Sequence, residues 1–548
     1  MLEGFTPYRQ EDAESYNRLR WWLGMTWGDV FDKATDLYPN KIGLVDDLGR
    51  WTYRELRHKV DRLASGLIKL GLEKGDCVLV QTPNWHEYIF SFFALQKIGT
   101  IVVMLVPRHN QIEINHFASL TKAKAWILPT RYGKIDYEPI VDGVLRQNPQ
   151  LKHLITARGE WAGKSENFEK LMNEADLNGE SLQTIRDRRP DPGEVAQVMP
   201  TGGTTGMPKA APRTHNDYLN NVEYHSRAWE ITSNDTLLVI TPVAHGMGMH
   251  WGIGGAFFNF ARLVLLDSTE PETICETIQR EKVTALPSVP AIVTRIVNLD
   301  NLGQYDLGSL KKISVGGAPS TPDLVKAVWT KIGCKYHNGL GSVEGTCAAT
   351  RTEDDIETIC YSVGKQICPY DTLKIVDSEG NELPQGREGE LVSKGPGIFT
   401  GYFKSPEDNK KVFTEDGFFR TGDLARKDER GYIYITGRIK DIINRGGEKV
   451  SAVEIENLIS EHGAVESVAV IGMPDMVLGE RICAYVKPAA GKSVTVEEII
   501  GFLKDKGASV LQLPERIEFV ESLPLTNVGK HDKKALREDI RKRMGWKE

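Results

Sequence analysis

One segment of the chain combines glycine, threonine and lysine in a way suited to binding phosphate. It begins Thr201-Gly202-Gly203-Thr204-Thr205-Gly206 and continues through Pro208 to Lys209. Glycine lets the backbone approach a ligand closely, and threonine hydroxyls and exposed N–H groups donate hydrogen bonds to phosphate oxygens. The pattern differs from the G-x-x-x-x-G-K-[ST] loop of ATPases, because Lys209 follows proline and precedes alanine. Taken alone, the segment fits either a phosphate cradle or a flexible turn.

Four other short motifs follow in the sequence. Each of them, taken alone, is explained by ordinary surface or turn residues without a function. A glutamate is usually a surface residue, an aspartate a turn residue, and an arginine or lysine a solvated side chain. The motifs are Gly341-Ser342-Val343-Glu344, Thr421-Gly422-Asp423, Gly437-Arg438 with Lys440, and Pro524-Leu525-Thr526-Asn527-Val528-Gly529-Lys530.

Together with the first segment, these motifs resemble in order and spacing those of the adenylate-forming superfamily. That superfamily comprises acyl-CoA synthetases, adenylation domains of peptide synthetases and beetle luciferases. The segments GFTPYRQEDAESY, PRTHNDY and INRGGEKVSAVEIE are similar to the 2,3-dihydroxybenzoate–AMP ligases and related aryl acid activating enzymes. The resemblance covers nearly the whole chain.

The resemblance implies that a carboxylate attacks the α-phosphate of ATP, releases pyrophosphate and then passes its acyl group to a thiol. It implies that Lys530 stabilises charge in the first step and that Glu344 holds Mg²⁺, a cation that prefers carboxylate and phosphate oxygens. Asp423 is expected to accept hydrogen bonds from the ribose hydroxyls, with Arg438 supporting the nucleotide. The remaining ATP-binding residues implied are Thr201, Gly202, Gly203, Thr204, Thr205, Gly206, Lys209, Gly317, Ala318 and Gly341.

The acyl pocket implied by the resemblance has an apolar wall. His245 borders it and is assigned to the catalytic set as well, and the other lining residues are Gly246, Met247, Trp251, Gly316 and Gly339. In dihydroxybenzoate ligases an asparagine that binds the ring 2-hydroxyl follows this histidine, whereas Gly246 follows it here. A glycine and methionine wall does not replace that polar contact. The hypothesis is an aromatic or alicyclic acid without the catechol pair, of the benzoate or cyclohexenecarboxylate type.

The acceptor implied is the thiol of coenzyme A, with Gly446, Gly447 and Lys449 as contacts for its pantetheine arm and Lys440 as the hinge. Coenzyme A is favoured because no carrier-protein segment follows the C-terminal domain. The alternative is an aryl-AMP ligase that loads a separate carrier protein.

Two departures from the family pattern give some weight to a different class, a non-catalytic nucleotide-binding or regulatory protein. Val343 replaces the usual threonine, and Leu340 replaces the aromatic residue on which adenine stacks. The presence of Lys530, Asp423, Arg438 and Glu344 argues against that class. A luciferase-like oxygenase is not favoured, because nothing in the chain specifies oxygen chemistry.

Composition limits the partners. A net charge of −7 over 548 residues argues against nucleic acid. The seven cysteines include no C-x-x-C pair, which predicts neither a zinc site nor a disulfide framework and fits a cytoplasmic compartment. The N-terminus has no apolar signal core, and the most apolar stretch, 89–106, is interrupted by Gln96, Lys97 and Gly99, so no membrane segment is expected. A homodimer is compatible with the sequence but not required by it.

The pattern of apolar residues predicts an α/β fold of more than one domain. A helix over 53–70 precedes buried strands at 77–81, 101–106, 125–128, 237–240 and 263–266, which indicates parallel sheets covered on both faces. Short strands at 373–376, 389–393, 418–420 and 431–436 indicate a β-rich subdomain. We therefore predict a large N-terminal AMP-binding domain over 1–437, divided into α/β subdomains (1–363) and a β-rich subdomain (364–437). A small mobile α+β domain is predicted over 438–548, with its hinge near Lys440.

Overall fold

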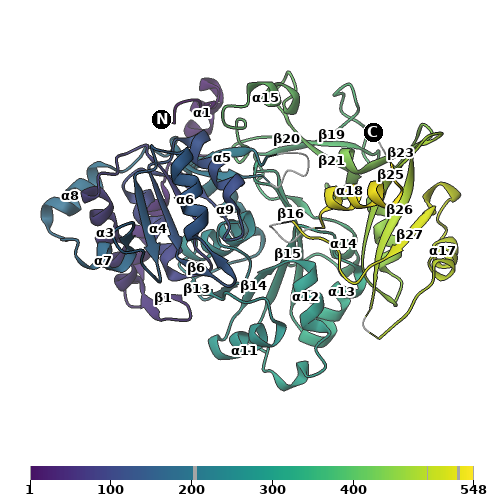
Figure 1. Ribbon diagram of the computed structural model, residues 1–548, viewed down its shortest axis with the longest axis horizontal. Coiled ribbons are helices and arrows are strands. Elements are labelled where there is room, and N and C mark those ends of the chain that lie inside the picture. Colours follow the sequence, from purple (N-terminus) through teal and green to yellow (C-terminus); the bar gives the residue numbers. More distant parts are fainter. Residues whose placement is uncertain (1, 202–206, 490, 527–530, 547–548) are drawn as a thin grey trace.

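Two large, mainly parallel sheets form the body of the protein in a computed structural model that describes residues 2–201, 207–489, 491–526 and 531–546. They occupy the purple-to-teal part of Figure 1, and the C-terminal residues form a separate yellow lobe. The mixed α/β fold with β-rich regions confirms the predicted fold class.

The first large sheet carries the phosphate-binding segment at one edge. Its strand order is β11-β10-β4-β3-β5-β8-β9, and only β11 is antiparallel to its neighbour. The strands are β3 (Cys77–Val80), β4 (Ile101–Met104), β5 (Ala125–Pro129), β8 (His153–Ala157), β9 (Glu166–Asn167), β10 (Val195–Pro200) and β11 (Ala210–Thr214). Thr201 and Lys209, the described ends of the glycine-threonine segment, therefore follow β10 and precede β11 directly.

The second large sheet draws on distant parts of the chain. Its order is β18-β17-β16-β15-β14-β12-β13-β1-β2, with β17, β18 and β2 antiparallel to their neighbours. The strands are β1 (Ile42–Val45), β2 (Arg50–Thr52), β12 (Thr236–Val239), β13 (Arg262–Leu265), β14 (Ala285–Ser288), β15 (Lys312–Gly316), β16 (Lys335–Gly341), β17 (Cys347–Ala349) and β18 (Lys365–Gln366).

Helices between and around the sheets complete the N-terminal part. One hydrophobic cluster joins residues of both sheets to α2, α3 and α4, and every residue of α4 is buried. Thr52 and Glu55 form a capping box that begins α3. The helices are α1 (Gln10–Arg18), α2 (Trp27–Leu37), α3 (Tyr53–Lys69), α4 (His86–Lys97), α5 (Gln111–Thr121), α6 (Glu138–Gln147), α7 (Phe168–Asn173), α8 (Gly179–Asp187), α9 (His215–Ala228), α10 (Gly255–Phe258), α11 (Pro271–Glu281), α12 (Pro290–Val297), α13 (Pro322–Ala327), α14 (Ile356–Tyr361) and α15 (Pro406–Val412).

Two smaller sheets follow. The first is antiparallel and contains β19 (Thr372–Val376), β20 (Gly389–Lys394), β21 (Phe419–Lys427) and β22 (Ile433–Arg438). The second contains β23 (Ile442–Arg445), β24 (Glu448–Ser451), β25 (Val465–Asp475), β26 (Gly479–Pro488) and β27 (Arg516–Phe519), with helices α16 (Ala452–Ser460), α17 (Val496–Asp505) and α18 (Lys533–Arg543). The basic α18 buries Leu536 and Ile540, so only part of its surface is solvated.

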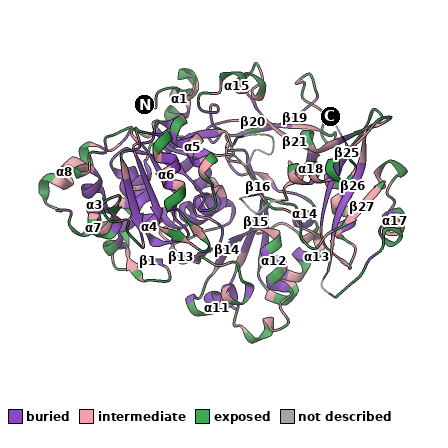
Figure 2. Ribbon diagram, in the orientation of Figure 1, coloured by how far each residue is buried: buried purple, intermediate pink, exposed green. Residues whose placement is uncertain are grey.

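Burial follows the layers. The strands of the large sheets run through the purple interior of Figure 2, whereas α15 has no buried residue. All seven cysteines are unpaired and buried. Across the described parts of the chain, no helix combines the length and apolar character needed to cross a bilayer.

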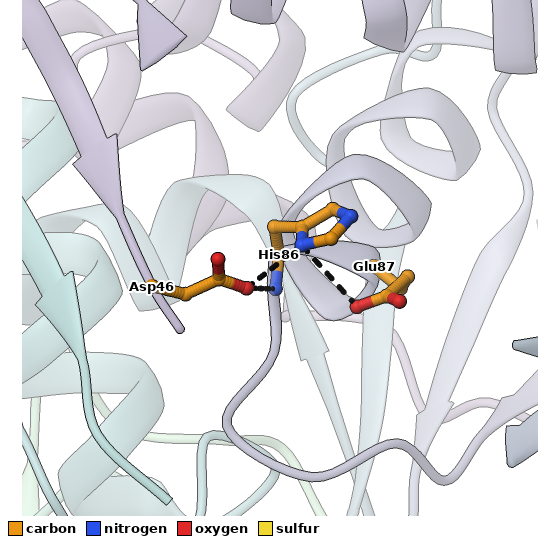
Figure 3. Close-up of side chains that lie close together, drawn as sticks. All are labelled: Asp46, His86 and Glu87. Carbon is orange, nitrogen blue, oxygen red and sulfur yellow. Dashed lines mark hydrogen bonds and ion pairs between the residues drawn. The ribbon is translucent and has the colours of Figure 1, made fainter. Parts of the chain in front are cut away.

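A buried ionic cluster ties the two large sheets together at the start of α4 (Figure 3). His86 Nδ1 lies 2.7 Å from Asp46 Oδ2 and 3.5 Å from Glu87 Oε2. Arg158, after β8, forms ion pairs with Glu87 at 2.9 Å and with Asp46 at 3.3 Å. Three such groups could ligate a metal ion, but the Arg158 guanidinium already supplies positive charge to both carboxylates. We therefore interpret the cluster as structural.

The imidazole in this cluster predicts a loss of stability at alkaline pH. Burial alone would lower the pKa of His86, but hydrogen bonds to Asp46 and Glu169 and the charges of Glu87 and Asp46 raise it to about 9. The unfolded pKa is about 6.5. Protonated His86 therefore stabilises the folded protein fully below about pH 6.5, and this contribution is lost as the pH rises through about 9. Its size is on the order of 3 kcal/mol.

Thermal unfolding of the wild type and His86→Gln between pH 6 and 10 tests this prediction. The wild type should be the more stable at the acidic end, and the two melting temperatures should converge above about pH 9. His153→Gln is the matched control, because burial lowers the pKa of His153 and no alkaline loss is expected from it. A constant difference between the wild type and His86→Gln would contradict the assignment.

Candidate active site

The predicted site residues gather where the strands of the large sheets end. Gly316 is the last residue of β15, and Gly339 and Gly341 are among the last three residues of β16. Gly317 and Ala318 are exposed immediately after β15. In open α/β sheets, ligands bind outside the carboxyl ends of the parallel strands. Gly317 has φ of +84°, a conformation that glycine adopts without strain.

The two ends of the phosphate-binding segment are joined at its base. The Thr201 N–H donates to the Lys209 carbonyl at 2.9 Å, and the Lys209 N–H donates to Thr201 Oγ1 at 3.2 Å. Gly202, Gly203, Thr204, Thr205 and Gly206 lie outside the described residues, as does Lys530, so their predicted roles stay predictions.

Lys209 and Glu344 converge on a tyrosine that the motifs did not include. The Tyr402 hydroxyl donates to Glu344 Oε1 at 2.6 Å, and Lys209 Nζ lies 4.8 Å from the centre of the Tyr402 ring. Lys209 also pairs with Asp408 on α15 at 3.2 Å. Tyr402 follows Gly401 in a Gly-Tyr pair, and that local pattern alone carries no signal of this contact.

Glu344 fits the role of a magnesium ligand. Among the described residues its Oε2 takes part in no hydrogen bond or ion pair, so one carboxylate oxygen is available to a cation beside phosphate. Partial burial works to lower the pKa of Arg438, but the charges of Asp423, Asp441 and Glu344 raise it. The Glu344 carboxylate therefore acts on the same region as the predicted ribose site.

Asp423 and Arg438 form that region on adjacent strands of the β-rich sheet. They are paired in register across β21 and β22, and Arg438 Nε lies 2.6 Å from Asp423 Oδ1. Only 6% of Asp423 is exposed, and its N–H donates to Thr421 Oγ1 at 3.0 Å. The predicted pair is therefore together in space, with the carboxylate held in place by its neighbours.

Trp251 lies against two glycines of the predicted acyl pocket, Gly316 and Gly339, and one of the predicted ATP site, Gly341. A Cβ built on Gly316 would lie 2.6 Å from the Trp251 ring, and one on Gly339 or Gly341 would lie 3.5 or 3.8 Å from it. Behind it, the Trp251 ring packs edge-on against Trp229 at 4.4 Å and His225 at 4.8 Å. Trp251 is 7% exposed and would form the inner wall of the predicted pocket.

An unusual helical segment carries Met247 and Trp251 of the predicted pocket. Residues Met247–Gly254 form a π-helix, a form frequent at functional sites. His245 precedes it and accepts a hydrogen bond at Nδ1 from the Met247 N–H at 3.4 Å. A Cβ built on Gly246 would meet only Met199 of β10, at 3.9 Å. Gly246 therefore leaves space beside the strand that leads into the phosphate-binding segment.

The predicted hinge and the predicted pantetheine contacts lie in two turns on either side of β23. Lys440 lies in a short 3-10 turn (Ile439–Asp441) between β22 and β23. Gly446 and Gly447, with φ of +62° and +94°, form the tip of the β23–β24 hairpin, and Lys449 is exposed on β24. Leu525 pairs with His531 in an isolated antiparallel bridge, so these two residues lie side by side.

Arg213 is a second residue that the motifs did not identify. It is buried, forms an ion pair with Asp217 at 2.6 Å, and donates to the Val343 carbonyl at 2.7 Å and the Gly397 carbonyl at 2.8 Å. It therefore fixes the backbone next to Glu344 against β11. Leu340, by contrast, packs against the core of the β-rich sheet.

Comparison with known proteins agrees with this geometry. Residues 31–403 match the family described as AMP-binding enzyme, and residues 454–530 match the AMP-binding enzyme C-terminal domain. The chain belongs to the AMP-binding enzyme family, whose members use ATP to form adenylates.

Within that family the chain is similar to aryl acid adenylating enzymes, as its motifs predicted. It is 37% identical to the 2,3-dihydroxybenzoate-AMP ligase of Bacillus subtilis (strain 168), over 99% of both chains. It is 34% identical to a salicylyl-CoA synthase / salicylate adenylyltransferase of Streptomyces sp, over 98% of both. It is 33% identical to the salicyl-AMP ligase / salicyl-S-ArCP synthetase of Mycobacterium tuberculosis (strain ATCC 25618 / H37Rv), over 98% of this chain and 94% of that one. The solved apo structure of MbtA from Mycobacterium smegmatis has a TM-score of 0.75 and 33% identity, over 98% of this chain and 99% of that one.

Proposed function

We propose that this protein activates an aryl or alicyclic carboxylic acid as its acyl-adenylate and transfers the acyl group to a pantetheine thiol. The observation that carries the proposal is that Lys209 and Glu344, which follows β16, both contact Tyr402, and that the Glu344 charge also acts on Arg438 of the Asp423–Arg438 pair. These groups suit a triphosphate and a ribose, and the family match supports ATP as the nucleotide.

In the first step, an oxygen of the carboxylate forms a bond to the α-phosphorus of ATP, and the bond to pyrophosphate breaks. Two anions must meet, so catalysis depends on positioning and on positive charge. Lys209 and the phosphate-binding segment would hold the triphosphate, and Asp423 the ribose. Mg²⁺ held by Glu344 would neutralise phosphate charge. Lys530 would act where the carboxylate meets the α-phosphate.

The proposed acyl pocket has no polar side chain at position 246 to bind a hydroxyl group of the acid. Gly246 offers no side chain, and Met247 and Trp251 of the proposed lining are apolar side chains in one hydrophobic cluster. We infer an acid without the catechol pair, of the benzoate or cyclohexenecarboxylate type. ATP–pyrophosphate exchange with a panel of acids tests this, and benzoate should be activated at least about 10-fold better than 2,3-dihydroxybenzoate. A preference for the catechol acid would overturn the assignment of the acid and leave adenylation intact.

For the acceptor, we propose the phosphopantetheine thiol of a separate carrier protein. The relatives named as AMP ligases and as a carrier-protein synthetase support this acceptor better than the coenzyme A favoured from the sequence. Coenzyme A remains the second candidate, supported by the relative named as a CoA synthase. In either case the thiol sulfur attacks the acyl carbon, its proton is lost to solvent, and AMP leaves.

A test with two acceptors distinguishes them. The enzyme, ATP and acid are incubated with holo aryl carrier protein or with coenzyme A, and thioesters are detected by mass. Faster acylation of the carrier protein is expected, and thioester formation only with coenzyme A would reverse the choice of acceptor.

We also propose, from the resemblance to the family, that the chain divides into two domains and that the C-terminal domain is mobile. The division falls at residues 437 and 438, and Lys440 is the hinge about which the C-terminal domain turns between the two steps. Buried unpaired cysteines and the family's small-molecule substrates support the cytoplasm as the compartment.

A further inference from the structure

Hydrogen bonds of the Tyr402 backbone hold this residue in place, in addition to the contacts of its side chain. The Tyr402 N–H donates to Asn409 Oδ1 at 2.8 Å, and Asn409 Nδ2 donates back to the Tyr402 carbonyl at 2.9 Å. The next residue, Phe403, donates to the Ala210 carbonyl of β11 at 2.8 Å. The segment that carries Tyr402 is therefore attached to the strand that follows the phosphate-binding segment.

The same segment also holds the backbone of Glu344. The Phe399 N–H donates to the Glu344 carbonyl at 2.8 Å, so both the main chain and the carboxylate of Glu344 are contacted by residues 399–402. Only 7% of Tyr402 is exposed, and its ring packs against Phe399. Because both the backbone and the ring of Tyr402 are held by neighbouring residues, its hydroxyl can set the orientation of the carboxylate that it contacts.

The chemistry of the phenol determines the direction of this hydrogen bond. An ionised carboxylate only accepts hydrogen bonds, so the Tyr402 hydroxyl is the donor. Glu344 accepts at Oε1, and Oε2 is left for a cation. Carboxylates that bind metal ions are commonly held by such a hydrogen bond from a neighbouring side chain.

The aromatic ring of Tyr402 contacts a second charged group, the Lys209 ammonium. Lys209 Nζ lies 4.8 Å from the ring centre, within the range of a cation–π interaction. Asp408 attracts the same ammonium from 3.2 Å. One side chain thus touches both the carboxylate that would face the metal and the lysine that would face the triphosphate.

We propose that Tyr402 is a positioning residue that sets the Glu344 carboxylate for a Mg²⁺–triphosphate and seats the Lys209 ammonium beside it. The proposal rests on the proposed adenylation function. An opposite role is conceivable on the same contact, in which Tyr402 occupies Glu344 and must release it when the metal binds. The two roles predict opposite changes in metal affinity when the hydroxyl is removed.

Tyr402→Phe separates these roles, because it removes the hydroxyl and retains the ring. Binding of ATP in the absence of any acid is measured by calorimetry across a titration of Mg²⁺, which gives a readout independent of turnover. We expect the apparent Kd for Mg²⁺ to rise at least about 10-fold. ATP binding without Mg²⁺ should be unchanged. Tyr402→Leu removes the ring as well and should weaken ATP binding by a further factor of about 2 to 5.

The matched control is Tyr485→Phe in the C-terminal domain. Tyr485 is buried and donates to Asp539 Oδ2 at 2.8 Å, so the same group is removed from a tyrosine–carboxylate pair outside the site. The Mg²⁺ dependence of Tyr485→Phe should match the wild type. Circular dichroism and melting temperature confirm that each variant folds.

The outcomes separate this proposal from the proposed function. Acid-dependent pyrophosphate exchange by the wild type is measured first, and its absence with every acid tested would count against adenylation itself. With exchange present, an unchanged or tighter Mg²⁺ dependence in Tyr402→Phe would overturn the positioning role of Tyr402. A higher Mg²⁺ requirement in exchange, with kcat recovered at saturating Mg²⁺, would support it.

Discussion

Lys530→Ala is expected to lower acid-dependent ATP–pyrophosphate exchange on the order of 10²- to 10³-fold, the loss typical when one preorganised charge donor is removed. Adenylation brings a carboxylate and a triphosphate together, and an ammonium placed between them stabilises the transition state more than the separated reactants. The turn-forming sequence Pro524-Leu525-Thr526-Asn527-Val528-Gly529 and the bridge from Leu525 to His531 suit a loop that presents one side chain.

Transfer of the acyl group from supplied acyl-adenylate should largely survive in Lys530→Ala, because no phosphate bond is broken in that half-reaction. Single-turnover formation of the thioester from synthetic adenylate measures it. Lys534→Ala is the matched control, because Lys534 is exposed on α18 a few residues beyond the loop. It should behave as the wild type in both assays.

Lys440→Pro should show the reverse pattern, because proline fixes φ in the connector between β22 and β23 and restricts rotation there. Lys440→Ala removes the same charge without restricting the backbone, so it separates the hinge from the side chain. Equal losses of both half-reactions in Lys530→Ala and Lys440→Pro would contradict the assignment of Lys530 to adenylation and of the Lys440 hinge to acyl transfer.

The elements of the fold were largely predictable from the sequence because they depend on local patterns. The helix predicted at 53–70 is α3, and the buried strand predicted at 101–106 is β4, which ends at Met104. Strand ends were displaced by one or two residues, and by more in β21, which continues to Lys427. Where a strand stops depends on its neighbour in the sheet, and a single sequence does not contain that information.

Long-range pairings could not be predicted. β1 lies beside β13, although more than two hundred residues separate them in the chain. The hydrogen bond from Tyr402 to Glu344 likewise joins residues far apart in sequence, and a lone Gly-Tyr pair carries no pattern for it. The motifs identified charged groups that are proposed to act on ligands, whereas the residues that hold those groups emerge only from packing.

The acyl pocket shows the same division between local and long-range information. Sequence motifs identified Trp251, Gly316 and Gly339 separately, and the structure shows why the glycines are required beside that tryptophan. A side chain at Gly316 would overlap the indole, because its Cβ would lie 2.6 Å from the ring. If the acid binds in the proposed pocket, its size would therefore be set by one large side chain packed on small ones.

Trp251→Ala is expected to change which acids are activated. Removing the indole opens the inner end of the pocket over Gly316, Gly339 and Gly341, so a bicyclic acid such as 2-naphthoate should fit. A single-ring acid loses its packing surface. The ratio of kcat/KM for 2-naphthoate to that for benzoate should rise on the order of 10²-fold, since each added or missing methylene contributes about 10- to 200-fold. The exchange assay with both acids measures the ratio.

The substitution will also cost stability, about 3–5 kcal/mol for a buried tryptophan. Trp251→Phe keeps a smaller ring and should show a smaller change of preference in the same direction. Trp329→Ala, a partly buried tryptophan in the cluster on the other face of the second sheet, controls for the loss of an indole outside the pocket. Because a general loss of stability lowers activity with both acids, only a change in their ratio reports on the pocket. An unchanged ratio in Trp251→Ala would show that the indole does not border the acid.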